Sequence, residues 1–335
     1  MKTNEPFSAA ALAIDAPAVA DAIAAKIKEQ VLGTLHRRGV VVGLSGGVDS
    51  SVVAALAVRA LGPARVFGIF MPERHSSGES ERLGRLVASS LGIESALDTI
   101  DGALEGAGCF TRQAEAIREV FPEYGDGWKC KITLPSILDS DRLNVFQLTV
   151  QDPSGATKRS RMPPGAFRKL VAATNFKQRV RKMVEYYHAD RLGYAVAGTP
   201  NRLEYDQGFF VKQGDGAADF KPIAHLYKTQ VYAIAAALGV PEEIRSRPPT
   251  TDTYSMEQTQ EEFFFALPYD RMDLCLYARD HDVAPEEAAP VVGITPEQVT
   301  RIYKDIDAKR KASAYLHATP LLIEPVATHA PGGGH

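Results

Sequence analysis

The chain is poor in cysteine, with only Cys109, Cys130 and Cys275 among 335 residues. Three is an odd number, and no two of these residues form a Cys-x-x-Cys pair, so the sequence offers neither a disulfide framework nor a zinc site. The eight histidines include no His-x-x-x-His pair either. Cysteine and histidine therefore indicate reduced thiols and packing or surface residues, and they give no metal motif.

Long apolar runs and an excess of positive charge are also missing. No segment approaches the about eighteen apolar residues that a membrane-spanning helix needs. A net charge of −3 argues against a general nucleic-acid-binding protein. The alanine-rich start is interrupted by acidic residues and lacks the basic start of a signal peptide. These absences predict a soluble cytoplasmic protein.

With 45% hydrophobic residues, the chain can bury a large core. We expect a single domain over residues 1–325, with an inserted segment at 122–164 and a disordered tail at 326–335.

Short β-branched runs alternate with amphipathic segments along the chain. The pattern predicts strands at 39–45, 65–71, 93–100 and 193–199, and helices at 18–36, 50–61, 79–91, 103–120, 167–188 and 229–238. Such alternation is typical of an α/β fold: a doubly wound parallel sheet with helices on both faces. The last third of the chain is helical by pattern.

The segment 122–164 departs from this alternation. Predicted strands at 144–150 and 157–162 flank the turn sequence QDPSGA, which indicates a β-hairpin inserted into the α/β body. The second of these strands carries Lys158, Arg159 and Arg161. These side chains either reach a substrate or partner, or simply protect a solvated sheet edge. Residues 248–260 are polar and rich in turn residues, as a mobile loop would be.

The sequence VVGLSGGVDSSVV, residues 41–53, places a Ser-Gly-Gly turn between a predicted strand and a predicted helix. Its glycines do not fit the G-x-G-x-x-G dinucleotide motif, and the lysine of a Walker A loop is absent. Backbone N–H groups and serine hydroxyls at a helix N-terminus instead suit a phosphate chain. Gly46 and Gly47 allow close approach, and Asp49 offers a carboxylate to Mg²⁺. A turn without a ligand is the alternative.

This loop resembles the pyrophosphatase loop of the N-type ATP pyrophosphatases, whose fold is adenine nucleotide alpha hydrolase-like. Those enzymes cleave ATP between its α and β phosphates, adenylate a substrate oxygen and release pyrophosphate.

The second half of the chain resembles the NAD synthetases within that superfamily. Residues 197–231, AGTPNRLEYDQGFFVKQGDGAADFKPIAHLYKTQV, are similar to the family's GTxNxxE and KxGDGxxDxxPIxxLxKTQV block. The helix NFKQRVRKMVEYY resembles NxKxRxRMxxxY, RPPTTD resembles KxPTAD, and FMPERHSS resembles the segment at the adenine site.

The resemblance implies roles for individual residues. The ATP-binding residues would be Gly43, Ser45, Gly46, Gly47, Asp49, Ser50, Met71, Thr199, Lys228 and Thr250. Deamido-NAD would be bound by Arg181, Tyr186, Lys212, Asp215 and Asp219. Asp49 and Glu204 would share Mg²⁺, and Asp49, Lys228 and Thr250 would be catalytic.

The activity implied is the ATP-dependent amidation of deamido-NAD to NAD through an acyl-adenylate, with ammonia as nitrogen donor and AMP and pyrophosphate as products. The resemblance also implies a homodimer that meets at the long helix 167–188. The polar 248–260 loop is a candidate lid that would exclude water from the adenylate. Two enzymatic alternatives remain: an amide ligase for another carboxylate, and a synthetase supplied by a separate glutaminase. A catalytically silent binding protein is disfavoured because Asp49, Glu204 and Lys228 are all present.

Three features depart from the family pattern. The 122–164 insertion is longer than the expected connection. Gln260 replaces an acidic residue in the sequence QTQEEFFF. The MPERHSS segment is closer to the glutamine-dependent enzymes, although we expect no glutaminase domain before Val41.

Overall fold

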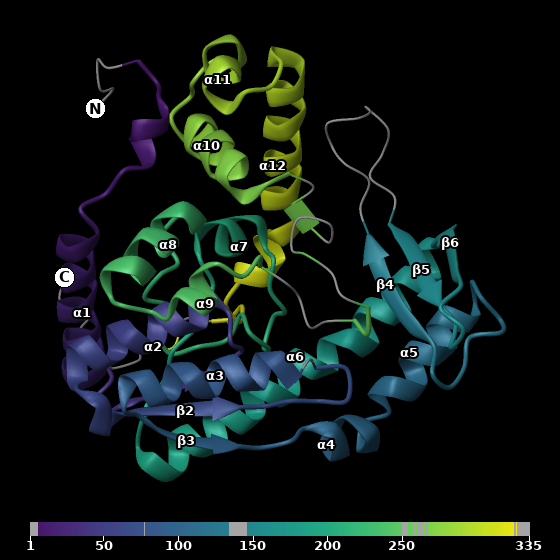
Figure 1. The fold of residues 1–335 in the computed structure, drawn as a ribbon, viewed down its shortest axis with the longest axis horizontal. Coiled ribbons are helices and arrows are strands. Elements are labelled where there is room, and N and C mark those ends of the chain that lie inside the picture. Colours follow the sequence, from purple (N-terminus) through teal and green to yellow (C-terminus); the bar gives the residue numbers. More distant parts are fainter. Residues whose placement is uncertain are drawn as a thin grey trace.

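A computed structural model of the protein describes residues 6–76, 78–133, 146–249, 254–256, 259, 264–265, 267–324 and 326. Its centre is a parallel four-stranded sheet in the order β3-β2-β1-β7 (Figure 1). The strands are β1 (Val40–Gly43), β2 (Val66–Phe70), β3 (Glu94–Leu97) and β7 (Ala195–Val196). The chain runs outward from β1 to β3 and returns to the other side of β1 as β7. The carboxyl ends of β1 and β7 therefore form a topological switch point, where such sheets bind ligands.

Helices cover both faces of the sheet. Alternate residues of β1 point to opposite faces, and both sets are apolar, so each face packs against helices. Val40 and Val42 pack with α1 (Ala16–Lys28), α2 (Val48–Leu61), α3 (Gly78–Leu91) and α8 (Lys228–Ala237). Val41 faces the other way, towards the long helix α6 (Pro164–Leu192). The predicted doubly wound α/β fold is confirmed.

One predicted helix is wrong. The segment predicted as a single helix at 103–120 forms two helices, α4 (Asp101–Gly106) and α5 (Cys109–Arg118). Gly108 separates them with a φ of 70°, a left-handed conformation that ends a helix and that glycine adopts without steric cost.

The inserted segment is larger than the predicted hairpin. Strands β5 (Gln147–Gln151) and β6 (Thr157–Arg161) form that hairpin, and β4 (Lys129–Thr133) adds a third antiparallel strand. The sequence analysis missed β4 because it is short and includes two lysines, while only Cys130 and Ile132 belong to the apolar core that it shares with α5 and α6. Figure 1 shows this sheet beside α5, at the opposite end of the molecule from α1.

The C-terminal third of the chain is helical, as predicted, with α9 (Glu242–Arg245), α10 (Tyr269–Asp280), α11 (Pro285–Val292) and α12 (Pro296–His317). The short helix α7 (Arg202–Gln207) was not predicted. Short helical turns lie at Ala9–Leu12, Glu29–Thr34 and Pro63–Arg65, and the second of these continues α1 in the span predicted as one helix. No helix in the described part of the chain has both the length and the apolar character needed to cross a bilayer. Most of the 248–260 loop and of the 326–335 tail lies outside the described residues.

Candidate active site

The Ser-Gly-Gly turn connects the end of β1 to the first turn of α2. Gly46 has a φ of 77°, and a Cβ there would lie 2.6 Å from the carbonyl oxygen of Ser80, so only glycine fits. The Ser50 hydroxyl donates to the Gly47 carbonyl at 3.1 Å, and Ser45 Oγ accepts from the Gly47 N–H at 3.3 Å. The loop is thus folded tightly at a helix N-terminus, the geometry that binds phosphate.

Three elements bring polar side chains to this loop. Lys228, at the start of α8 and 2% exposed, forms an ion pair with Asp49 at the start of α2. Asn201 donates from Nδ2 to Asp49 Oδ1 at 3.1 Å. Asn201 and Glu204 form a capping box at the start of α7: the Glu204 N–H donates to Asn201 Oδ1, and the Asn201 N–H donates to Glu204 Oε2. The capping box therefore sets Glu204 beside Asp49.

The charges in this group are unbalanced, with two carboxylates and one ammonium. Burial, followed by the charge of Asp49, raises the pKa of Glu204 to about 8, although Lys228 opposes both effects. Burial alone lowers the pKa of Lys228, but Asp49 and Glu204 outweigh it and the net shift is upward. A divalent cation fits here, because it supplies the missing positive charge.

The donor set favours magnesium over a metal held by protein alone. Across the described residues, no group of three or more histidine, cysteine or acidic side chains is arranged to hold a metal. Mg²⁺ is commonly held by one or two carboxylates together with substrate phosphates. Asp49 and Glu204, next to a phosphate-binding loop, are such a pair.

A buried residue of the C-terminal helices fixes the backbone at Lys228. Asp273 of α10 is fully buried, and its carboxylate accepts from the backbone N–H groups of Lys228 at 3.2 Å and Thr229 at 2.7 Å. It caps α8 from a distant part of the sequence. Spacing alone gave no sign of this contact.

The Ser-Gly-Gly loop, Asp49, Glu204 and Lys228 line one cavity of about 500 Å³. It also includes most of the residues that the resemblance implied: Gly43, Ser45, Gly46, Gly47, Asp49, Ser50, Met71, Arg181, Thr199, Glu204, Asp215 and Lys228. The glycine-rich loop, the end of β7 and the middle of α6 therefore meet as predicted from the motifs.

Three other predicted residues, Lys212, Tyr186 and Asp219, contact residues outside the cavity wall. Lys212 Nζ donates to the carbonyl oxygens of Tyr315 at 2.8 Å and Ala318 at 2.9 Å, at the end of α12. The Tyr186 hydroxyl donates to Asp219 Oδ1 at 3.2 Å, and Asp219 Oδ2 accepts from a β7 backbone N–H. Among the described residues, these three are not part of the cavity wall. Thr250 lies outside the described residues.

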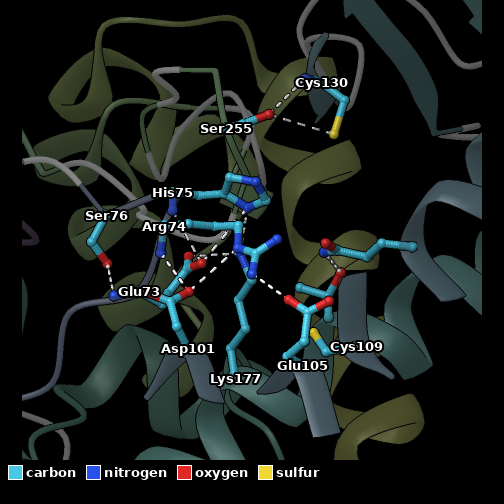
Figure 2. Close-up of polar contacts among 12 residues, drawn as sticks. Glu73, Arg74, His75, Ser76, Asp101, Glu105, Cys109, Cys130, Lys177 and Ser255 are labelled. Carbon is cyan, nitrogen blue, oxygen red and sulfur yellow. Dashed lines mark hydrogen bonds and ion pairs between the residues drawn. The ribbon is translucent and has the colours of Figure 1, made fainter. Parts of the chain in front are cut away.

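The segment after β2, predicted to lie at the adenine site, is tied to α6 by a buried ion pair (Figure 2). Glu73 Oε1 and Lys177 Nζ are 2.8 Å apart, and both side chains are almost completely buried. His75 Nδ1 lies 3.1 Å from Lys177 Nζ, and burial followed by the charge of Lys177 lowers the pKa of His75 to about 4. The histidine is therefore neutral near pH 7.

The inserted segment also contributes to the cavity wall, which the sequence analysis did not foresee. Phe146 and Phe167 line the cavity and stack with ring centroids 4.2 Å apart. The Met256 N–H donates to the Cys130 carbonyl at 3.1 Å, and the Cys130 N–H donates to Ser255 Oγ at 2.9 Å. The inserted sheet thus holds residues 254–256 against the cavity.

The basic strand β6 has partners within the inserted segment. Lys158 pairs with Glu123 at 2.5 Å, and Arg159 donates to Thr133 Oγ1 at 3.3 Å. Because these partners belong to the inserted segment itself, the contacts favour the interpretation of β6 as a sheet edge protected by charge.

A doubly wound sheet whose central strand runs into a phosphate loop without a Walker lysine defines an ATP-pyrophosphatase-type nucleotide-binding fold. A model of the family described as NAD synthase matches residues 19–119 and 139–313, and the chain belongs to this family.

Individual relatives agree with this assignment. The chain is 65% identical over 311 residues to the NH(3)-dependent NAD(+) synthetase of Mesorhizobium japonicum, covering 93% of this chain and 98% of the relative. Its counterpart from Rhizobium meliloti is 58% identical, with 96% of each chain covered. Among solved structures, the NH3-dependent NAD synthetase from Campylobacter jejuni shares the fold at a TM-score of 0.59 and 21% identity, over 93% of this chain and all of that one.

Proposed function

We propose that the protein amidates deamido-NAD to NAD with ATP and ammonia, through an acyl-adenylate. Ammonia-dependent NAD synthesis is the activity of this chain: the relatives named for it are 65% and 58% identical over nearly its whole length. The observation that supports the chemistry is the convergence of Asp49, Glu204 and Lys228 on the Ser-Gly-Gly loop.

In the first step, a nicotinate carboxylate oxygen attacks the α-phosphorus of ATP. The bond from that phosphorus to the bridging oxygen breaks, and pyrophosphate leaves. The loop N–H groups and Lys228 stabilise the negative charge that develops on the phosphates. Asp49 and Glu204 would hold a magnesium ion, which would neutralise part of the negative charge on the ATP phosphates. Positioning and charge stabilisation supply the rate enhancement in this step.

In the second step, ammonia attacks the activated carbonyl carbon. The bond from that carbon to the AMP oxygen breaks and the attacking nitrogen loses one proton to solvent, so that the amide and AMP are released. The substrate pocket extends from the phosphate loop past Arg181 and Asp215, which line the cavity on the α6 side. Arginine suits a phosphate or carboxylate of deamido-NAD.

We extend the proposal to a homodimer that meets along α6. Met183 and Tyr187 of this helix are 60% and 63% exposed, an unusual exposure for large apolar side chains in the middle of a protein's longest described helix. Sedimentation equilibrium of the wild type and of a Met183→Lys/Tyr187→Glu variant tests this point. A wild-type monomer at all concentrations contradicts it.

The test of the reaction is pyrophosphate release with ATP and Mg²⁺, with and without deamido-NAD. We expect release and NAD formation only when deamido-NAD and ammonium are both present, and no NAD from glutamine. Nicotinate mononucleotide serves as a competing acid, and its preference over deamido-NAD contradicts the assigned substrate. NAD formed from glutamine by the purified protein contradicts the assigned nitrogen donor.

A further inference from the structure

Another buried ion pair lies in the cavity wall, and neither of its two residues was among the predicted site residues. Lys182 Nζ and Glu185 Oε2 are 2.6 Å apart on α6, and the two residues are 6% and 7% exposed. Both line the cavity. Lys182 stands where the family motif NxKxRxRM has methionine, so the pair is a departure from the pattern that otherwise covers this helix.

Glu185 lies against the carboxyl end of the central strand. Gly43 points to the α6 face of the sheet, like Val41, and a Cβ on Gly43 would lie 2.9 Å from Glu185 Oε1. The same Cβ would lie 3.2 Å from Cε of Met71, the residue that follows β2. The carboxylate therefore lies on the α6 face of the sheet, at the carboxyl end of β1, against the position that a side chain on residue 43 would take.

The position of Glu185 determines which part of a bound ATP its carboxylate can contact. Gly43 lies two positions before Ser45 of the phosphate loop, and Met71 is on the adenine side by the family resemblance, so we expect the ribose of ATP between them. A carboxylate repels phosphate but accepts hydrogen bonds from hydroxyl groups. Carboxylates at the carboxyl ends of parallel strands bind ribose hydroxyls in this way in other doubly wound folds.

Lys182 directs the carboxylate. Its ammonium binds Oε2, so that Oε1 is the oxygen turned to Gly43. We propose that Glu185 binds the ribose hydroxyls of ATP and that Lys182 is the positioning residue that holds it there. This inference rests on the proposed function for the identity of the nucleotide, and it adds the residue that selects ribonucleotides over deoxyribonucleotides.

The test must remove the pair without leaving a buried charge. Replacing one partner leaves the other uncompensated and destabilises the fold, whereas replacing both by apolar residues of similar volume is often neutral. The variant is therefore Lys182→Met/Glu185→Leu. Its control is Glu119→Gln/Lys169→Met, which removes a surface ion pair of 2.6 Å that ties the same helix α6 to α5, away from the cavity.

Binding is measured by calorimetry with nucleotide and Mg²⁺ alone, so the result does not depend on whether NAD is made. The wild type and the control should bind ATP about tenfold more tightly than 2′-deoxy-ATP or 3′-deoxy-ATP, the effect of one hydrogen bond to a charged group. In the double variant, ATP affinity should fall to the level of the deoxy analogue, whose own affinity changes little. Urea unfolding confirms that the variant folds.

Three results overturn the inference. The wild type binds ATP and both deoxy analogues equally, the double variant keeps the discrimination, or it loses affinity for all three nucleotides to the same extent. ITP provides a further arm, because it lacks the adenine amino group. If the variant loses its preference for ATP over ITP and keeps its preference over the deoxy analogues, Glu185 binds the base and not the ribose.

Discussion

The carboxylate of Asp273 accepts a hydrogen bond from the backbone N–H of Lys228, and so links the C-terminal helices to the phosphate-binding loop. Lys228 in turn pairs with Asp49 through its side chain. The position of the ammonium therefore depends on a residue that lies 45 positions away in the sequence. The α10 helix contributes to the active site without a side chain in the cavity wall at this point.

Replacing Asp273 should impair catalysis through Lys228. Asp273→Ala removes both acceptors of the α8 cap. We expect kcat to fall about tenfold or more, since displacing a catalytic group by about 1 Å can lower the rate by up to about a hundredfold. Asp273→Asn retains one acceptor and should recover most of the activity. Steady-state kinetics at saturating ATP and deamido-NAD separate kcat from KM. Equal activity of the two variants and the wild type contradicts the positioning role.

Asp273 should also make stability depend on pH. Burial raises its pKa from 3.8 to about 6, so the folded state binds the proton more tightly than the unfolded state. Between these two pH values the free energy of unfolding falls as pH rises. Relative to Asp273→Asn, the wild type should lose up to about 3 kcal/mol across this window, at about 1.4 kcal/mol per pKa unit. Urea unfolding of both proteins from pH 4 to 7 measures the difference. Parallel pH profiles contradict the shift.

The central strands β1 and β2 were predictable because they are short, fully or almost fully buried runs of Val, Ile and Phe with glycine. The phosphate loop was predictable because its motif includes Gly46, where only glycine fits. The features that the sequence analysis missed depend on contacts between distant segments of the chain. Strand β4 is a strand because it pairs with β5, and Asp273 matters because α10 packs beside α8. The Asn201–Glu204 capping box is an exception: its local spacing was visible in the sequence and was not used.

Lys228 should matter more for the transition state than for ATP binding. Lys228→Met removes the cation nearest to Asp49 and the phosphate loop, and we expect kcat for pyrophosphate release to fall by about a hundredfold to a thousandfold. Lys228→Arg keeps the positive charge on a planar guanidinium, and its kcat should lie between those of the wild type and Lys228→Met. Single-turnover release of pyrophosphate is the measurement. A change confined to the KM for ATP would falsify the assignment of Lys228 to the chemical step.

Glu204→Gln tests the magnesium site while leaving the fold intact. Glutamine serves the same role in the capping box of α12, where Gln298 accepts from the Thr295 N–H, so α7 should still form. Loss of the charge should raise the Mg²⁺ concentration for half-maximal activity by about tenfold. The titration is run at fixed free ATP. An unchanged Mg²⁺ dependence means that Asp49 and the ATP phosphates hold the ion without Glu204.

The buried Glu73–Lys177 pair should behave differently when one or both partners are replaced. Lys177→Met leaves the Glu73 carboxylate in the core without its cation, and breaking such a pair costs about 3–5 kcal/mol. Glu73→Leu/Lys177→Met removes both charges and should recover most of that loss. Urea unfolding of the two variants and the wild type measures the coupling. If the double variant is as unstable as the single one, the two residues stabilise the 71–76 segment independently, and the ion pair is not what ties this segment to α6.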